Sequence, residues 1–173
     1  VDLPTPDCAT HPSDCADVAV LDGLDGFNVQ PRVSIPFSGP IDTSTVSSDT
    51  VRLYDLGCLA CAPIGIDQAV WEPAANTLHA ESAALLAQHE TYLLVATTGL
   101  RAADGTAIDR TSFLRDLNFG QTKDEHAKKS RPALRDALQS TGTFTRAVAA
   151  SVFTTQSITA DLEKIRAQIG ASN

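Results

Sequence analysis

Methionine is absent from the 173 residues of this chain, and aromatic residues are scarce. A chain without methionine has no initiator, so we expect it to be a processed or excised piece of a longer polypeptide. Aromatic residues make up 5% of the chain, which is thin for a surface that stacks sugars or bases. No run approaches the roughly 18 apolar residues of a transmembrane helix, so we predict no membrane-spanning segment.

Basic residues are outnumbered, because 13 Lys and Arg face 21 Asp and Glu and leave a net charge of −8. Phosphate binding requires clustered Lys and Arg, so the composition argues against a nucleic-acid partner. Six aspartates precede Arg32, the first basic residue. Pro4, Pro6 and Pro12 also interrupt regular structure in this stretch. We therefore predict that residues 1–23 form an acidic, solvated and partly extended arm.

Motifs of catalysis and metal binding are also lacking. The sequence contains no Gly-x-Ser-x-Gly elbow, no His-Glu-x-x-His helix and no glycine-rich phosphate loop. Asp22 and Asp25 form a weak calcium candidate, because calcium requires about six to eight oxygen ligands and their run lacks the spacing of a calcium loop. We therefore predict no catalytic residue, cofactor or metal in this chain. A pair of glycosidase carboxylates needs no motif, so that alternative stays open.

Cysteine occurs as two local pairs, Cys8 with Cys15 and Cys58 with Cys61. The even count and short separations favour two disulfides and hence an exported protein, whether secreted, periplasmic or at the cell surface. One alternative is a zinc site of four thiolates, although the wide first gap is unlike a zinc knuckle. A second is a redox pair at Cys58 and Cys61, although its surroundings, rich in glycine and proline, favour a loop. A third is that this pair is reduced.

Short segments of alternating polarity dominate the middle of the chain. Pro31 and Pro36 cannot donate ladder hydrogen bonds, so the first segment should be an edge strand. The segment 92–98 is apolar on both faces and should be central. Strands separated by turns at intervals of about ten residues indicate an antiparallel β-sandwich. The period-two pattern predicts strands over residues 29–37, 51–54, 66–71, 77–81, 92–98 and 147–155.

Helical signals occur in two places. Residues 122–125 read as a capping box, and Ser130 is predicted to cap a second helix with Pro132 in its first turn and Gly142 at its end. These signals place a helical insertion at about 111–141, before the last strand. Residues 156–173 predict a C-terminal helix or linker. An apolar stripe on that helix needs a cover, from this domain or from a missing part of the protein; it consists of Ile158, Leu162, Ile165 and Ile169.

Residues 24–155 resemble the bacterial Ig-like domain first described in S-layer proteins. The resemblance rests on a strand ending in Phe-Ser before an Asp-containing turn, a Tyr-x-Leu strand before a Gly- and Asp-containing turn, and a closing Phe-Thr-Thr strand. Gly99 and Asp104 stand further apart than in the family pattern. The resemblance implies an Ig-like antiparallel β-sandwich with a helical insertion before the last strand. The matching stretches are residues 24–42, 50–53, 90–92, 99–105 and 152–155.

Residues 21–27, the helices near 122–141 and residues 152–157 are also similar to the N-terminal region of bacterial extracellular lipases of the virulence-factor type. In those proteins an Ig-like domain precedes an α/β-hydrolase domain. The resemblance implies a non-catalytic spacer or scaffold whose partner is the hydrolase domain of the same polypeptide. The alternative is a module that binds the cell envelope, a polysaccharide or a protein. Its candidate anchors are Trp71 and Tyr54 if they are exposed neighbours, whereas otherwise Trp71 belongs to the core.

Overall fold

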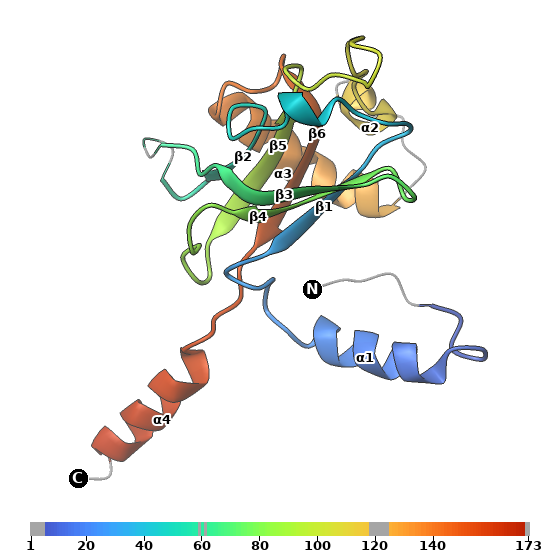
Figure 1. Ribbon diagram of the computed structural model, residues 1–173. Helices are drawn as coiled ribbons and strands as arrows, with labels where there is room; N and C mark the ends of the chain where they lie inside the picture. The colour runs from blue at the N-terminus through green and yellow to red at the C-terminus, as the bar shows by residue number, and fades with distance from the viewer. Residues whose placement is uncertain (1–5, 59, 61, 118–124, 172–173) are drawn as a thin grey trace.

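The computed structural model describes residues 6–58, 60, 62–117 and 125–171. Helices and strands follow one another along the chain, and Figure 1 shows their arrangement. The elements are α1 (Pro12–Asp22), β1 (Arg32–Pro36), the 3₁₀ turn η1 (Thr43–Thr45), β2 (Val51–Asp55), β3 (Ile66–Glu72), β4 (Thr77–Ser82), β5 (Thr91–Thr97), α2 (Ser112–Asp116), α3 (Glu125–Ser140), β6 (Ala147–Thr154) and α4 (Ala160–Ala171).

The strands form two antiparallel three-stranded sheets, with the orders β1-β4-β3 and β2-β5-β6. This confirms the predicted antiparallel sandwich. β5 lies between β2 and β6, as its two apolar faces predicted. β1 is an edge strand, also as predicted, but it is shorter than the segment 29–37 because Pro31 and Pro36 bound it.

The strand orders match part of the immunoglobulin topology. A constant-type immunoglobulin domain has a four-stranded ABED sheet and a three-stranded CFG sheet. Taken in chain order, β1 to β6 occupy the places of strands B to G, so the sheets are B-E-D and C-F-G. Within the described residues, no strand occupies the place of strand A beside β1.

One hydrophobic core lies between the two sheets. Ile35 of β1 and Leu78 of β4 face Leu53 of β2 and Leu94 of β5, and all four are buried. Tyr92 of β5 belongs to the same core and is 1% exposed. The inner faces of both sheets therefore interdigitate as in other β-sandwiches.

A second core covers the opposite face of β5. Leu93 and Val95 alternate with the residues that face the first core, since successive side chains in a strand point to opposite faces. They pack against Leu114 of α2 and against Leu134 and Leu138 of α3. The molecule thus has three layers, in which the predicted helical insertion forms the third (Figure 1).

The second insertion helix does not begin at Ser130, so that prediction was wrong. α3 runs without interruption from Glu125 to Ser140 and contains Pro132 in its interior. The helix continues past the proline because the buried residues described in α3, namely Leu134, Ala137 and Leu138, all follow it. Residues 122–124 of the predicted capping box lie outside the described residues.

Gly142 ends α3 as predicted. Its φ of +65° lies in the left-handed region, where glycine has no steric penalty. The Gly142 N–H donates to the Gln139 carbonyl and the Thr143 N–H donates to the Leu138 carbonyl. This pair of bonds is a Schellman motif, which satisfies carbonyls that a helix end otherwise leaves unpaired.

The described part of the N-terminal arm is solvated, but Pro12 does not interrupt regular structure there, which corrects that part of the prediction. α1 spans Pro12–Asp22 and has no buried residue. Pro12 does not disrupt this helix because it lies in the first turn, where its missing N–H would have no helical partner. None of the helices in the described ranges is long and apolar enough to cross a membrane.

The three-layer packing predicts the effect of two matched substitutions. Leu138→Ala in α3 removes a side chain that is 0% exposed, and we expect the free energy of unfolding to fall by about 2–5 kcal/mol. Leu162→Ala in α4 removes one that is 67% exposed and should change it by less than about 0.5 kcal/mol. Urea denaturation measures both values. Equal decreases in the free energy of unfolding for the two variants would show that α3 does not share a core with β5.

Candidate interaction site

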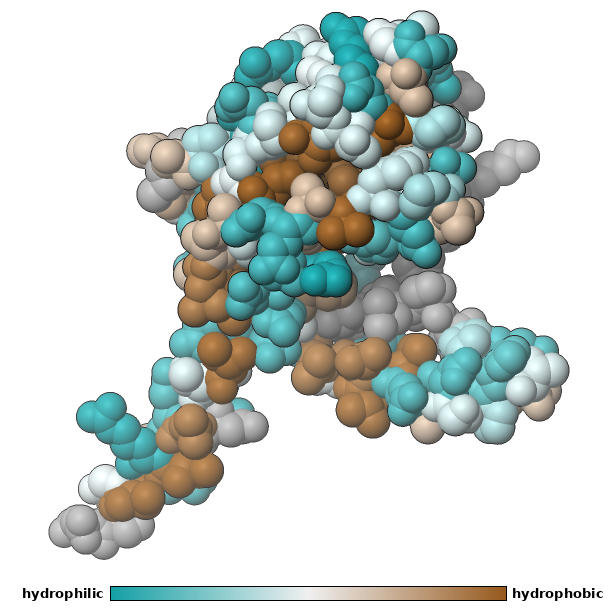
Figure 2. All heavy atoms as spheres, in the orientation of Figure 1, coloured by the Kyte–Doolittle hydropathy of each residue, from teal (hydrophilic) through white to brown (hydrophobic). Residues whose placement is uncertain are grey.

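Exposed apolar side chains lie on the two segments by which the chain enters and leaves the sandwich. Both α1 and α4 lie at this end of the sandwich, beyond the ends of the strands (Figure 1). Figure 2 shows apolar atoms along α4 and at the end of α1 nearer the sandwich. We call these side chains the exit surface: Val20, Leu21, Leu24, Phe27, Ile158, Leu162, Ile165 and Ile169, each at least 41% exposed.

The segments that carry the exit surface are joined to the sandwich by a hydrogen-bonded junction at Thr155. This residue is 0% exposed, and its hydroxyl donates to the Ala87 carbonyl at 2.7 Å and accepts from the Glu90 N–H at 3.0 Å. Its own N–H donates to the Glu90 carbonyl. The end of β6 is therefore tied to the loop before β5.

The N-terminal segment joins the same junction through Phe27. The Phe27 N–H donates to the Thr154 carbonyl and the Phe27 carbonyl accepts from the Gln156 N–H, both at 2.7 Å, which makes a one-residue parallel bridge with Thr155. The Phe27 ring meets Phe153 edge-on, at 6.1 Å between centroids. Gly26 lies so close that a Cβ there would be 2.4 Å from the Thr155 carbonyl carbon.

Asp25, a predicted calcium candidate, also acts in this junction. Its Oδ1 accepts from the Ser157 N–H at 3.0 Å, and its Oδ2 lies 4.0 Å from Nδ1 of His89. Hydrogen bonds from the Ser157 side chain and backbone lower the pKa of Asp25, and His89 adds a smaller electrostatic contribution. Among the described residues, no three or more His, Cys, Asp or Glu side chains are arranged to hold a metal. The two calcium candidates, Asp22 and Asp25, therefore belong to no such group.

Helix α4 begins directly after two hydrogen bonds between Thr159 and the side chain of Gln88. The Thr159 N–H donates to Gln88 Oε1 at 3.0 Å, and Gln88 Nε2 donates to Thr159 Oγ1 at 2.7 Å. The Thr159 hydroxyl in turn donates to Glu163 Oε1 at 2.7 Å. The start of α4 is thus anchored, whereas the described side chains from Leu162 onward are exposed.

The two aromatic candidates do not form one exposed platform. Trp71 is half-buried, lies 6.0 Å from Phe37 between ring centroids and packs against the core between the sheets. Tyr54 is half-buried and packs against the core under the helices. The alternative prediction, in which Trp71 belongs to the core, agrees with this placement.

The first cysteine pair forms a disulfide, since Cys8 is bonded to Cys15. Cys58 is disulfide-bonded too, and Cys61 lies outside the described residues. Disulfide-bonded cysteines carry no thiolate, so Cys8, Cys15 and Cys58 are not zinc ligands in this structure.

A polar row on the outer face of the first sheet was missed from the sequence. Ser34 Oγ lies 2.9 Å from Nδ1 of His79, and Nε2 of His79 lies 3.2 Å from Glu72 Oε2. Serine, histidine and a carboxylate are the components of a hydrolase triad. Here, however, Ser34 and Glu72 are exposed, and Ser34 lies within a regular strand rather than on a strained elbow. The row pairs side chains across neighbouring strands.

No protein-family model and no curated protein sequence matches the chain. Among solved structures, the N-terminal part of the bacterial S-layer protein SbsC aligns with 57% of this chain at 15% identity and a TM-score of 0.38. A second SbsC structure, covering domains 1–6, aligns with 57% at 16% identity and a TM-score of 0.37. The chain spans 25% and 15% of those S-layer chains. Similarity at this level gives no information about function.

Close contact at Gly26 gives a testable consequence for the junction. Gly26→Ala places a methyl group against the Thr155 backbone, and we expect it to lower the free energy of unfolding by about 1–3 kcal/mol. Gly39→Ala is the matched control, because a Cβ there meets nothing within 4 Å. The control should leave stability unchanged or raise it by up to about 1 kcal/mol. Urea denaturation compares them, and a harmless Gly26→Ala would refute the tight junction.

Proposed function

We propose that this chain is a non-catalytic accessory domain of an exported bacterial lipase or esterase, and that it holds a following α/β-hydrolase domain of the same polypeptide through the exit surface. The observation that supports the proposal best is the exposed apolar stripe of α4. The sequence resemblance to lipase N-terminal regions supplies the identity of the partner. The rest of the support comes from energetics and from the cysteines.

Exposure of the α4 stripe is costly unless a partner covers it. Burying a large apolar side chain contributes about 1.5–3 kcal/mol, and Leu162, Ile165 and Ile169 are each more than half exposed. A helix of 12 residues is also marginal in water without tertiary contacts. A domain that packs on this stripe would stabilise both the helix and the interface.

The disulfide supports the exported location. Disulfides persist in oxidising compartments and are rare in the cytosol. The bond between Cys8 and Cys15 closes the loop at the start of α1. This location is compatible with a secreted, periplasmic or surface-attached protein.

The alternative function as a polysaccharide-binding module receives less support. Sugar platforms use exposed rings, and Trp71 and Tyr54 are half-buried in separate cores. A protein partner in the cell envelope, by contrast, would use the same apolar exit surface as the hydrolase domain. The two partners are therefore distinguished by experiment rather than by the surface itself.

A first prediction concerns turnover. The purified chain should not hydrolyse a short-chain nitrophenyl ester above the buffer background, because the described residues contain no nucleophile elbow. Ser34→Ala should give the same background rate, whereas the intact polypeptide should be active. Turnover by the purified chain that Ser34→Ala abolishes would contradict a non-catalytic role.

A second prediction concerns the interface in the intact polypeptide. Leu162→Glu places a charge in the α4 stripe and should separate the two domains, so that a protease cleaves between them at least tenfold faster. Ala167→Glu adds the same charge to the same helix outside the stripe and should behave like the wild type. Limited proteolysis and ester turnover measure the effect. Identical behaviour of both variants would exclude the α4 stripe as the interface.

A further inference from the structure

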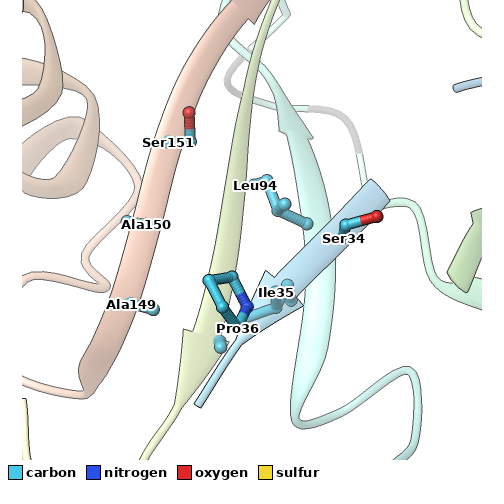
Figure 3. Close-up of a pocket in the computed structure, with 8 residues that line it drawn as sticks. Ser34, Ile35, Pro36, Leu94, Ala149, Ala150 and Ser151 are labelled. Atoms are coloured by element: carbon cyan, nitrogen blue, oxygen red, sulfur yellow. The ribbon is translucent and has the colours of Figure 1, made fainter. Parts of the chain in front are cut away.

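A groove opens on the side of the sandwich where strand A is missing. It lies between the edge of β1 and the edge of β6, and Figure 3 shows side chains of both strands around it. Ile35, Leu94 and Ala149 give this part of the groove an apolar lining without a charged residue, and Arg32 lines its continuation beside Val152. Its volume of about 150 Å³ is similar to that of an engineered cavity that binds benzene. The groove therefore has room for one apolar side chain.

The edge of β6 presents unpaired backbone groups to this groove. The Thr154 carbonyl points away from β5, because it accepts from the Phe27 N–H. Alternate residues of a strand direct their backbone groups to the same side. The backbone N–H and carbonyl groups of Ala150 and Val152 therefore also point away from β5. Within the described chain, neither has a backbone partner on that side.

The free stretch of this edge is short and bounded. At one end the Val148 carbonyl accepts from the Thr111 N–H, and at the other the Thr154 carbonyl is occupied by Phe27. Residues 149–153 lie between these points. They can pair with one short strand through as many as four hydrogen bonds, which are the N–H and carbonyl groups of Ala150 and Val152.

The edge of β1 is protected from pairing with an incoming strand, whereas the edge of β6 is not. The Phe37 N–H donates to the Asn76 carbonyl on the β4 side, so Ser34 and Pro36 direct their backbone toward the groove. Pro36 has no N–H, and Pro31 precedes the strand. Proline on an edge strand is a common defence against pairing with another chain. An incoming strand would therefore pair with β6.

The chain's own N-terminal segment has the wrong chemistry for this place. The parallel bridge at Phe27 would lead residues 22–26 along the free edge of β6. Their sequence is Asp-Gly-Leu-Asp-Gly, and Asp and Gly are depleted in strands. Asp25 is in addition already hydrogen-bonded to the Ser157 N–H. A second copy offers the same β6 edge, whose Ala150 and Ser151 are too small to fill the cavity.

We propose that the groove between β1 and β6 is a β-augmentation site for a short, uncharged, extended segment of a separate protein. The segment pairs with Ala150 and Val152 and inserts one apolar side chain, such as Val, Ile or Leu, beside Leu94 and Ala149. Backbone pairing gives the affinity in this binding mode, and the pocket gives the specificity. The site is independent of the exit surface and of the proposed hydrolase partner.

Selection of peptides tests the proposal on the whole chain. A phage library of random seven-residue peptides is selected against the immobilised protein, and the enriched peptides are synthesised and titrated by fluorescence anisotropy. We expect uncharged sequences with Val, Ile or Leu at alternate positions. Ala150→Pro should weaken their binding at least tenfold, because it removes an outward N–H without touching the β5–β6 ladder.

A second pair of variants separates a blocked site from a misfolded protein. Ala149→Leu fills the groove and should weaken binding at least tenfold, whereas Ala149→Ser keeps the volume and should bind like the wild type. Thermal denaturation shows whether each variant is folded. If Ala150→Pro unfolds the protein, the Ala149 pair decides the proposal alone.

Three outcomes would overturn the proposal. The first is that no peptide is enriched, or that binding is unaffected by both Ala150→Pro and Ala149→Leu. The second is enrichment of peptides with helical apolar spacing that still bind Ala150→Pro, which would assign recognition to the exit surface. The third is a wild-type dimer in light scattering that Ala150→Pro makes monomeric, which would identify a second copy as the occupant.

Discussion

The burial of β5 on both faces is the constraint on which the rest of the structure depends. Its successive side chains, Leu93 and Leu94, belong to different cores, one under the helices and one between the sheets. A strand in this position requires a layer on each side. The insertion α2–α3 is therefore a structural layer of the domain, and its loss would expose Leu93 and Val95 to solvent. The same constraint explains why α3 tolerates Pro132, since the packed residues that follow it stabilise the helix.

Much of the sandwich follows from period-two alternation and turn residues. The strands β2 to β6 lie at the predicted positions, and Gly142 marks the true end of α3. The predictions failed where proline was taken as a helix breaker or helix start without its context. Pro12 lies inside the first turn of α1, and Pro132 lies in the interior of α3. Local sequence does not show whether later residues will pack well enough to compensate a proline.

The candidate sites were harder to predict because they depend on register and on distant contacts. Ser34 and His79 face one another only because β1 and β4 pair in that register. Asp25 and Ser157 are separated by 132 positions, so a carboxylate that looked like a calcium ligand is a hydrogen-bond acceptor at the junction. The α4 stripe was visible from spacing alone, because the spacing of apolar residues along a helix defines a face without any knowledge of the fold.

The exit surface and the groove expose different chemistry, which argues that they serve different partners. Most side chains of the exit surface lie on α1 and α4, helices whose backbone is already hydrogen-bonded, so a partner gains chiefly by apolar burial. The groove presents backbone groups of Ala150 and Val152 that have no partner among the described residues, so its partner must be extended. Both arise from one property of the chain, namely that the described residues before Phe27 form α1 and an Asp-Gly run instead of strand A. This arrangement leaves Ala150 and Val152 at the β6 edge without a backbone partner among the described residues, and it places Val20, Leu21 and Leu24 in solvent beside the sandwich.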